Sequence, residues 1–399
     1  MTKTFLSRPA FICAAGSSAD TDSFVNNLKT ANRAGIKKVE CSLAGQSGVK
    51  SFFVGKVDDS LLKPTGDKYN TRTLELLNFA LSQLKDTAKT AVERYGAERV
   101  AVCIGQCDNG SALSFAAHKK FFTDGKFDKE YELKMQGADY VATFAQKVLG
   151  TKGPALSFAT ACSSSASAII KARQLIESKL ADAVICGGVD IASDTVLLGF
   201  DSLEAVSHNM TNPFSKNRDG INLGEGAALF VLSRDDLDNQ KIILAGCGES
   251  SDASHLTAPL ADGSGARSAM QKALDQAGLK PSQIDYINMH GTGTRLNDSM
   301  ESFGVDLVFK EYKVPVSTTK PLTGHTLGAA AALELAVCFY AIKNQFLPVQ
   351  GWDGQFDDDL PKLNIVSSPD VASEKPLQCC MSNSFAFGGA NASVIIRTE

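Results

Sequence analysis

One cysteine of this chain lies where the local structure would activate its thiol. Cys162 stands in residues 159–166, at a junction where an apolar stretch gives way to a helical pattern. The N-terminus of a helix carries partial positive charge and free N–H groups, which stabilise a thiolate, and the thiolate is the nucleophilic form of cysteine. The other nine cysteines are interpreted as small buried residues. Position alone makes Cys162 a candidate nucleophile, with an inert buried thiol as the alternative.

Two of the five histidines lie in glycine-flanked polar turns. His290 follows an apolar run that is predicted to be a strand, and His325 precedes an alanine-rich helical stretch. Ligands gather at strand ends in α/β folds, so both side chains are candidates, although each alone is equally well explained as an ordinary loop residue. Neither has a second His or Cys at short ligand spacing, so no metal site is expected.

Charged and glycine-rich residues accompany these candidates. Lys320 precedes His325 by five positions, and Glu334 follows it by nine. If both are buried, they compensate each other's charge and could fix the tautomer of His325; on the surface they would be ordinary solvated charges. The turn at 383–391 contains Gly388 and could bring backbone N–H groups close to a ligand. Its spacing fits neither a P-loop nor a dinucleotide-binding fingerprint.

The elements that would position these residues alternate between short apolar strands and helices, which is typical of an α/β fold. The predicted strands include 100–105, 183–188, 242–245 and 284–289, and the predicted helices include 71–95, 164–180, 266–277 and 328–342. The later elements repeat the pattern of the earlier ones. We therefore divide the chain into two halves, 1–241 and 242–399, and expect insertions in the first at 121–136 and 201–226.

Composition limits the class of protein. The chain has 399 residues, of which 44% are hydrophobic and 21% charged, with a net charge of -4 and no extended basic block. A nucleic-acid partner or a polybasic membrane surface is therefore not expected. The ten cysteines lack disulfide or metal-ligand spacing, which indicates reduced thiols and a cytoplasmic location. Residues 3–15 are too short in their apolar part for a signal sequence, and no 18-residue apolar stretch is expected to span a membrane.

Five ordered motifs resemble those of the β-ketoacyl-[acyl-carrier-protein] synthases, the elongating condensing enzymes of fatty-acid and polyketide synthesis. They are the Cys162 elbow, the segment from Asn212-Pro213-Phe214 to Gly224-Glu225-Gly226, the His290 turn with Asp298, Lys320 and His325 with Glu334, and Phe385-Ala386-Phe387-Gly388-Gly389. They extend over about residues 155–393. Five motifs in the right order are far more specific than any one of them.

The resemblance implies a thiolase-like fold, in which two similar halves stack as α-β-α-β-α layers. It also implies acyl transfer to Cys162, decarboxylation of malonyl-acyl carrier protein, and Claisen condensation that lengthens the chain by two carbons. His290 and His325 would donate N–H groups to the developing oxyanion. Lys320, paired with Glu334, would orient and tune the His325 side of the site.

Further site residues follow from the same resemblance. The backbone N–H groups of Cys162 and Phe387 would form an oxyanion hole, and a helix-end thiolate would need no general base. Phe387 and Gly388 would form a gate, supported by a second loop that contains Asp252. Thr292 and Thr294 would bind substrate. No cofactor is required, although some relatives suggest a structural monovalent cation near Glu334.

The implied partner is acyl carrier protein. Lys63, Lys68 and Arg72 are the expected docking residues, although ordinary solvated side chains would look the same. A homodimer is expected, with a heterodimer with a related synthase or chain-length partner as the alternative.

Two other functions compete with this interpretation. Degradative thiolases and initiating synthases generally replace one His with Cys or Asn, and non-catalytic chain-length partners lack the active Cys. The sequence does not choose between fatty-acid, polyketide and polyene synthesis, nor does it give the acyl length. It departs from the family at Arg295-Leu296-Asn297, at residues 106–109, and at Ala386, where glycine is usual and a Cβ would stiffen the gate.

Overall fold

The computed structural model describes residues 3–41, 48–129, 131–371, 373 and 375–399. Its helices are α1 (Thr21–Lys29), α2 (Arg72–Tyr95), α3 (Ser111–Asp124), α4 (Tyr140–Leu149), α5 (Ser164–Glu177), α6 (Asp194–Ser202), α7 (Ser264–Ala277), α8 (Arg295–Phe309), α9 (Lys320–Thr323) and α10 (Ala330–Asn344). Its strands are β1 (Phe5–Leu6), β2 (Ala10–Cys13), β3 (Gly16–Ser17), β4 (Ile36–Cys41), β5 (Lys50–Gly55), β6 (Val100–Gly105), β7 (Ala155–Phe158), β8 (Ala183–Asp190), β9 (Gly226–Ser233), β10 (Ile242–Ser251), β11 (Tyr286–Asn288), β12 (Pro315–Ser317), β13 (Asn364–Ile365), β14 (Cys379–Phe385) and β15 (Ala390–Thr398).

Strands β4 and β5 pair with each other in a small separate sheet, and the other described strands join into one mixed sheet. Its main path runs β13-β12-β11-β14-β15-β10-β1-β9-β8-β6-β7, and β2 pairs with β9 and β3 beside it. The strands at one end come from the first part of the chain and those at the other end from the second part. The short strand β1 pairs antiparallel with both β9 and β10, which places it at the junction. Strand β7 lies at the outer edge of the sheet.

Helices cover the strands in layers. Helices α5 and α10 lie in the middle, where one apolar cluster joins them to strands from both ends of the sheet. Helices α2 and α4 pack on the far side of β2, β6, β8 and β9, and α7 and α8 pack beyond β10 and β14. Strands β8 and β9 are buried along their whole length because helices cover both of their faces. The five-layer arrangement confirms the predicted fold.

The middle layer explains one difference from the sequence-based expectation. Residues Leu327–Asn344 do form a stretch long and apolar enough to cross a membrane, with mean hydropathy 1.3. However, 89% of this stretch is buried inside the fold. A helix that is hydrophobic on all sides either spans a membrane or is buried in a protein core. The apolar character of this stretch comes from packing on all sides in the central layer.

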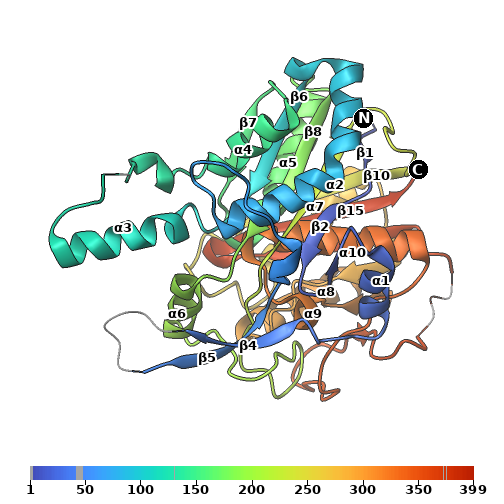
Figure 1. Cartoon of the computed structure of the whole chain (residues 1–399). Coiled ribbons are helices and arrows are strands. Elements are labelled where there is room, and N and C mark those ends of the chain that lie inside the picture. Colours follow the sequence, from blue (N-terminus) through green and yellow to red (C-terminus); the bar gives the residue numbers. More distant parts are fainter. Residues whose placement is uncertain (1–2, 42–47, 130, 372, 374) are drawn as a thin grey trace.

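Helix α3 projects from the body of the molecule (Figure 1). The segment from α3 to the following short turn exposes large apolar side chains, including Phe122 at 84% and Leu133 at 77%. Its own aromatic residues stack on one another, as Phe121 and Tyr131 do on Phe127. The projecting segment therefore has apolar surface that the described residues leave exposed.

Candidate active site

The Cys162 elbow joins a strand to a helix of the middle layer. Strand β7 leads into the short turn Ala161–Ser163, and α5 begins directly after it. Ala161 adopts the left-handed region with a φ of 50°, a conformation that costs free energy for a residue with a Cβ and that often marks a functional turn. The thiol of Cys162 is buried, 6% exposed, at the start of the helix. The predicted strand-to-helix junction is present.

The protonation state of this thiol differs from the prediction. The pKa of Cys162 is raised to about 12, mainly by burial and in smaller part by the charge of Asp190. Lys320 and the backbone N–H groups of Phe387 and Cys162 lower the pKa but do not offset the burial. The expectation of a preformed thiolate is therefore wrong for the resting site, because the sulfur has lost more solvation than the nearby positive charge restores.

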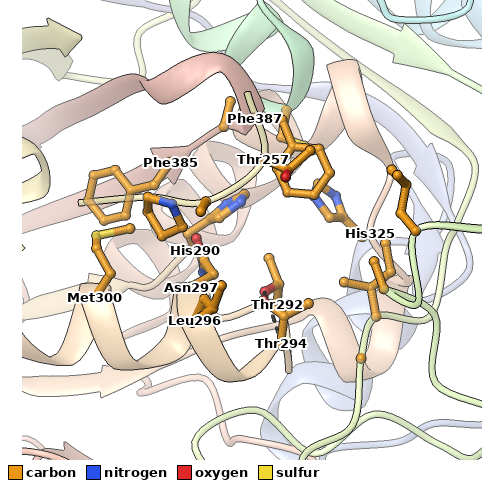
Figure 2. A pocket seen from close by; sticks show the side chains of 18 of the residues that line it. Thr257, His290, Thr292, Thr294, Leu296, Asn297, Met300, His325, Phe385 and Phe387 are labelled. Atoms are coloured by element: carbon orange, nitrogen blue, oxygen red, sulfur yellow. Dashed lines mark hydrogen bonds between the residues drawn. The ribbon is translucent and has the colours of Figure 1, made fainter. Parts of the chain in front are cut away.

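The two histidines lie beside the cysteine. The sulfur of Cys162 and one ring nitrogen each of His290 and His325 all lie within 4.8 Å of one another. The ring centroids of the histidines are 5.3 Å apart, and the rings are nearly perpendicular at 86°. Figure 2 shows both rings at the same end of a pocket. The fold thus brings together three side chains that are separated by up to 163 positions in the sequence (325 − 162).

Hydrogen bonds fix the tautomer of each ring. The Lys320 ammonium lies 3.3 Å from Nδ1 of His290, and the backbone N–H of Leu327 donates to Nδ1 of His325 over 3.2 Å. Both Nδ1 atoms therefore accept, and in the neutral rings the proton lies on Nε2. Burial, followed by the charge of Lys320, lowers the pKa of both rings well below the usual value. Both histidines are neutral N–H donors at pH 7.

Lys320 contacts a different histidine from the one that we expected. It lies at the start of α9 and forms a buried ion pair with Glu334 of α10. Its hydrogen bond goes to His290, not to His325, whose turn is held by backbone groups instead. Burial raises the pKa of Glu334 to about 7, and Lys320 opposes this shift. Lys320, paired with Glu334, therefore orients His290, while the positive charge of Lys320 lowers the pKa of both histidines.

A sulfur and two ring nitrogens at this spacing are also donors that could hold a metal ion. A metal-bound imidazole normally donates its other N–H to an acceptor. Here the other nitrogen of each ring is itself an acceptor, from Lys320 and from Leu327. The arrangement fits hydrogen-bond donation toward the cavity better than metal binding.

Phe387 lies in the turn between β14 and β15. Gly388 has a φ of 81°, a left-handed conformation that favours glycine, and its N–H donates to the carbonyl of Leu256 over 2.6 Å. Asp252 ties the second loop to this turn, because its N–H donates to Gly389 and its carboxylate accepts from Asn391. The predicted contact between the two loops is present.

Ala386 shows no backbone strain in this conformation. Its φ of -102° and ψ of 157° lie in the extended region that any residue adopts. The Cβ of Ala386 therefore does not strain the backbone of the turn that contains Phe387 and Gly388. The ring of Phe387 stacks on Phe200 of α6, with centroids 5.9 Å apart. Phe200 was not predicted from the sequence.

Cys162, His290, His325 and Phe387 line a cavity of about 470 Å³ (Figure 2). Thr292 and Thr294 line it, as predicted, and their hydroxyl oxygens lie 3.0 Å apart. Other lining residues are Phe200, Leu203, Glu204, Asp219, Ile221, Thr257, Pro259, Arg295, Leu296, Asn297, Met300 and Phe385. Three exposed leucines accompany this cavity: Leu203 and Leu296 line it, and Leu256 directly precedes the lining residue Thr257. We call them the rim leucines.

The expected docking residues differ from one another in their surroundings. Arg72 makes a two-pronged contact with the buried Glu225 at 2.7 Å and also contacts Asp59, so it holds the fold together and is not a free docking charge. Lys68 pairs with Glu132. Lys63 is exposed. None of the three lines the cavity described above.

Two acidic residues of α8 support the His290 turn. Asp298, whose motif was noted in the sequence, accepts from the N–H groups of Phe214 and Gly293. Glu301 was not predicted; it accepts from the N–H groups of His290 and Gly291 at 2.8 and 2.7 Å. The spacing of three residues from Asp298 puts both on one helix face, and this spacing is the signal that could have revealed Glu301.

Comparisons with known proteins agree with these features. Two family models match, described as "Beta-ketoacyl synthase, N-terminal domain" over residues 10–237 and "Beta-ketoacyl synthase, C-terminal domain" over 242–351. Nodulation protein E of Rhizobium meliloti (strain 1021) is 36% identical over 310 residues, which cover 72% of this chain and 76% of that protein. The 3-oxoacyl-[acyl-carrier-protein] synthase 2 of Vibrio harveyi is 30% identical over 386 residues, covering 89% and 92%.

Solved structures show the same similarity. One chain of a structure described as "Ketosynthase (ApeO) in Complex with its Chain Length Factor (ApeC) from Xenorhabdus doucetiae" superposes with a TM-score of 0.89. Its sequence is 37% identical, and the match covers 100% of this chain and 98% of that chain.

Proposed function

The chain belongs to the β-ketoacyl synthase family, whose members elongate acyl chains by Claisen condensation, and from this premise we propose which residues carry out each step. The observation that supports the assignment most is the convergence of the Cys162 sulfur with His290 and His325 on one cavity. Cys162 is the nucleophile, and the two imidazoles stabilise the enolate.

In the first step, the sulfur of Cys162 attacks the carbonyl carbon of an acyl thioester. The C–S bond to the carrier thiol breaks, and the proton of Cys162 ends on that leaving thiol, so no net charge is left in the buried site. The N–H groups of Cys162 and Phe387, which point at the sulfur, are placed to stabilise the tetrahedral oxyanion.

In the second step, a malonyl thioester loses carbon dioxide, and the electron pair of the broken C–C bond forms an enolate. Its oxygen accepts from Nε2 of His290 and Nε2 of His325. The enolate carbon then attacks the acyl group on Cys162, the C–S bond breaks, and the sulfur leaves as a thiolate. This thiolate takes up a proton from solvent to regenerate the resting thiol. Two neutral donors suit this step because they stabilise a charge that is present only while the reaction proceeds.

The substrate is delivered by acyl carrier protein through the opening of the cavity. Thr292 and Thr294 contact the arm that carries the thioester. The rim leucines are 55% (Leu203), 76% (Leu256) and 61% (Leu296) exposed, an unusual concentration of apolar side chains around one opening. They support an apolar contact with the carrier. Leu256 also accepts from Gly388 through its carbonyl, so the contact lies next to the gate.

A second subunit of the same fold covers the projecting segment. The edge strand β7 offers unpaired backbone groups, and the segment around α3 exposes Phe122 and Leu133. Both features support a dimer. A homodimer is our first expectation, and the ApeO–ApeC complex supports the alternative of a heterodimer with a chain length factor.

A structural monovalent cation beside Glu334 also fits the side chains. Oε2 of Glu334 and Oδ1 of Asn288 are buried oxygens for which the described residues supply no hydrogen-bond donor, and they lie on the neighbouring elements α10 and β11. Oxygen atoms of this kind are ligands for hard cations. A cation held there would offset negative charge behind the Lys320–Glu334 pair.

The function is tested by incubating the protein with acyl-carrier protein and malonyl-carrier protein and analysing the products by mass spectrometry. We expect a β-ketoacyl product two carbons longer than the acyl primer, and none from a Cys162→Ala variant. Primers of different lengths would give the acyl preference. Product formation by the Cys162→Ala variant at the wild-type rate would overturn the assignment.

A further inference from the structure

A buried carboxylate lies behind the catalytic cysteine, outside the cavity and outside the roles assigned above. Asp190 is the last residue of β8 and is fully buried. Its Oδ2 accepts from the N–H groups of Cys107 at 2.7 Å and Gly328 at 2.8 Å. Its Oδ1 accepts from Asp108 at 3.2 Å and from Ile191 at 3.3 Å. One side chain thus receives four backbone donors from three segments of the chain.

Two of these segments lead directly to the catalytic groups. The thiol of Cys107 donates to the carbonyl of Ala161, the residue before Cys162, over 3.1 Å. Gly328 lies in the turn Leu327–Ala329, whose first N–H holds Nδ1 of His325. Asp190 is therefore connected both to the elbow of the nucleophile and to the turn that sets the tautomer of His325.

The packing around Asp190 leaves little freedom for these segments. A Cβ on Gly328 would lie 2.8 Å from Oδ2 of Asp190 and 2.6 Å from Cα of Gln106, so the backbones of Gly328 and Gln106 and the side chain of Asp190 are closely packed. A carboxylate can accept from several N–H groups at once, whereas an amide has one accepting oxygen and would turn its own NH2 toward other donors. The chemistry of this position therefore requires an acid.

The charge of Asp190 opposes the chemistry of the neighbouring thiol. Asp108 and Cys107 face Asp190 from the loop after β6, and Lys320 faces Cys162 from α9. Burial raises the pKa of Asp190 to about 7, and its charge raises the pKa of Cys162. A negative group behind a nucleophilic thiol is unfavourable for thiolate formation, so a geometric requirement must outweigh this effect.

We propose that Asp190 is a positioning residue for the condensation step, which holds the Cys162 turn and the His325 turn at their working distance through the N–H groups of Cys107 and Gly328. It does not touch the substrate. This inference rests on the proposed roles of Cys162 and His325. Its consequence is specific: acyl transfer needs only the cysteine and its oxyanion hole, whereas condensation also needs His325 in register with the sulfur.

The test compares Asp190→Asn and Asp190→Glu with a matched control, Asp285→Asn. Asp285 is also a buried carboxylate that accepts from backbone N–H groups, those of Gln378 and Cys379, but it pairs with Lys375 and its donors belong to neither the Cys162 turn nor the His325 turn. Two rates are measured by rapid quench and mass spectrometry: acylation of Cys162 and condensation of the preformed acyl-enzyme. The pH dependence of Cys162 alkylation by iodoacetamide is the third measurement.

For Asp190→Asn we expect condensation to fall by about tenfold to a hundredfold relative to acylation, the size of effect that follows a small misplacement of reacting groups. Alkylation should shift to lower pH, because a negative charge next to the thiol has been removed. Asp190→Glu should keep the alkylation profile but still lose condensation, and it decides the question if the Asn variant does not fold. Asp285→Asn should change neither the rate ratio nor the profile.

Equal rate ratios for wild type and both Asp190 variants would overturn the positioning role, as would the same losses in Asp285→Asn. Failure of the wild-type protein to condense would instead contradict the proposed function. The two failures are therefore distinguishable.

Discussion

Replacing Lys320 by Met removes the donor to His290 and one half of a buried ion pair. Lys320 and Glu334 have side chains only 2% and 4% exposed. Removal of one partner leaves a buried carboxylate without compensation, which typically destabilises a protein by about 3–5 kcal/mol. The double variant Lys320→Met/Glu334→Gln removes that uncompensated charge. We therefore expect the single variant to lose stability and the double variant to regain most of it.

Condensation should not return with stability. In both variants Nδ1 of His290 has lost the ammonium that fixes its tautomer. The charge of Lys320 lowers the pKa of both rings, so its removal raises these pKa values toward the ordinary value near 6.5. Weakening one oxyanion donor typically costs about 100-fold or more in rate. Condensation should therefore stay at least tenfold below wild type in the double variant, and its low-pH limb should move to higher pH.

The assay pairs thermal unfolding with single-turnover condensation of the preformed acyl-enzyme. Glu334→Gln alone serves as the control that keeps the contact between Lys320 and His290. If the double variant regains wild-type condensation along with stability, Lys320 has only a structural role and our assignment of the His290 tautomer is wrong.

Three further predictions follow from the site. His290→Ala should slow condensation by about 100- to 1,000-fold while leaving acylation of Cys162 measurable, and near-normal condensation would remove its role as a donor. Because burial raises the pKa of Cys162, alkylation of the free protein by iodoacetamide should show an apparent pKa above the ordinary value of about 8.5. An apparent pKa below about 7 would instead support a thiolate in the resting site. Leu256→Ser should raise the KM for acyl-carrier protein several-fold but not the KM for a small acyl thioester. Leu180→Ser, an equally polar change at another exposed leucine, is the control. Equal effects of Leu256→Ser on both substrates would contradict docking at the rim leucines.

Local sequence signals were sufficient for much of the site. Cys162, His290 and His325 all lie at strand-to-turn or turn-to-helix junctions, which are visible as changes in hydrophobic spacing beside glycine or small residues. The same spacing predicted several of the longer strands and helices, including α2 and β6. The order of the five motifs along the chain then indicated the family to which these residues belong.

The remaining features depend on which segments meet in space. The contact of Lys320 with His290 joins residues 30 positions apart, and no local pattern distinguishes it from a contact with the nearer His325. The pKa of Cys162 is raised because several elements bury the sulfur. The sequence showed only the helix N-terminus, whose backbone N–H groups lower this pKa. Arg72 looked like a free surface charge because its partner Glu225 lies 153 positions away.

The central claim is that the growing chain is carried on the sulfur of Cys162 between two half-reactions. Peptide mass spectrometry after incubation with acyl-carrier protein alone tests it most directly. We expect the mass of the acyl group on the peptide with Cys162, none on the peptide with the neighbouring Cys107, and loss of the adduct once malonyl-carrier protein is added. An acyl group on another residue, or one that persists on Cys162 while the β-ketoacyl product forms, would contradict it.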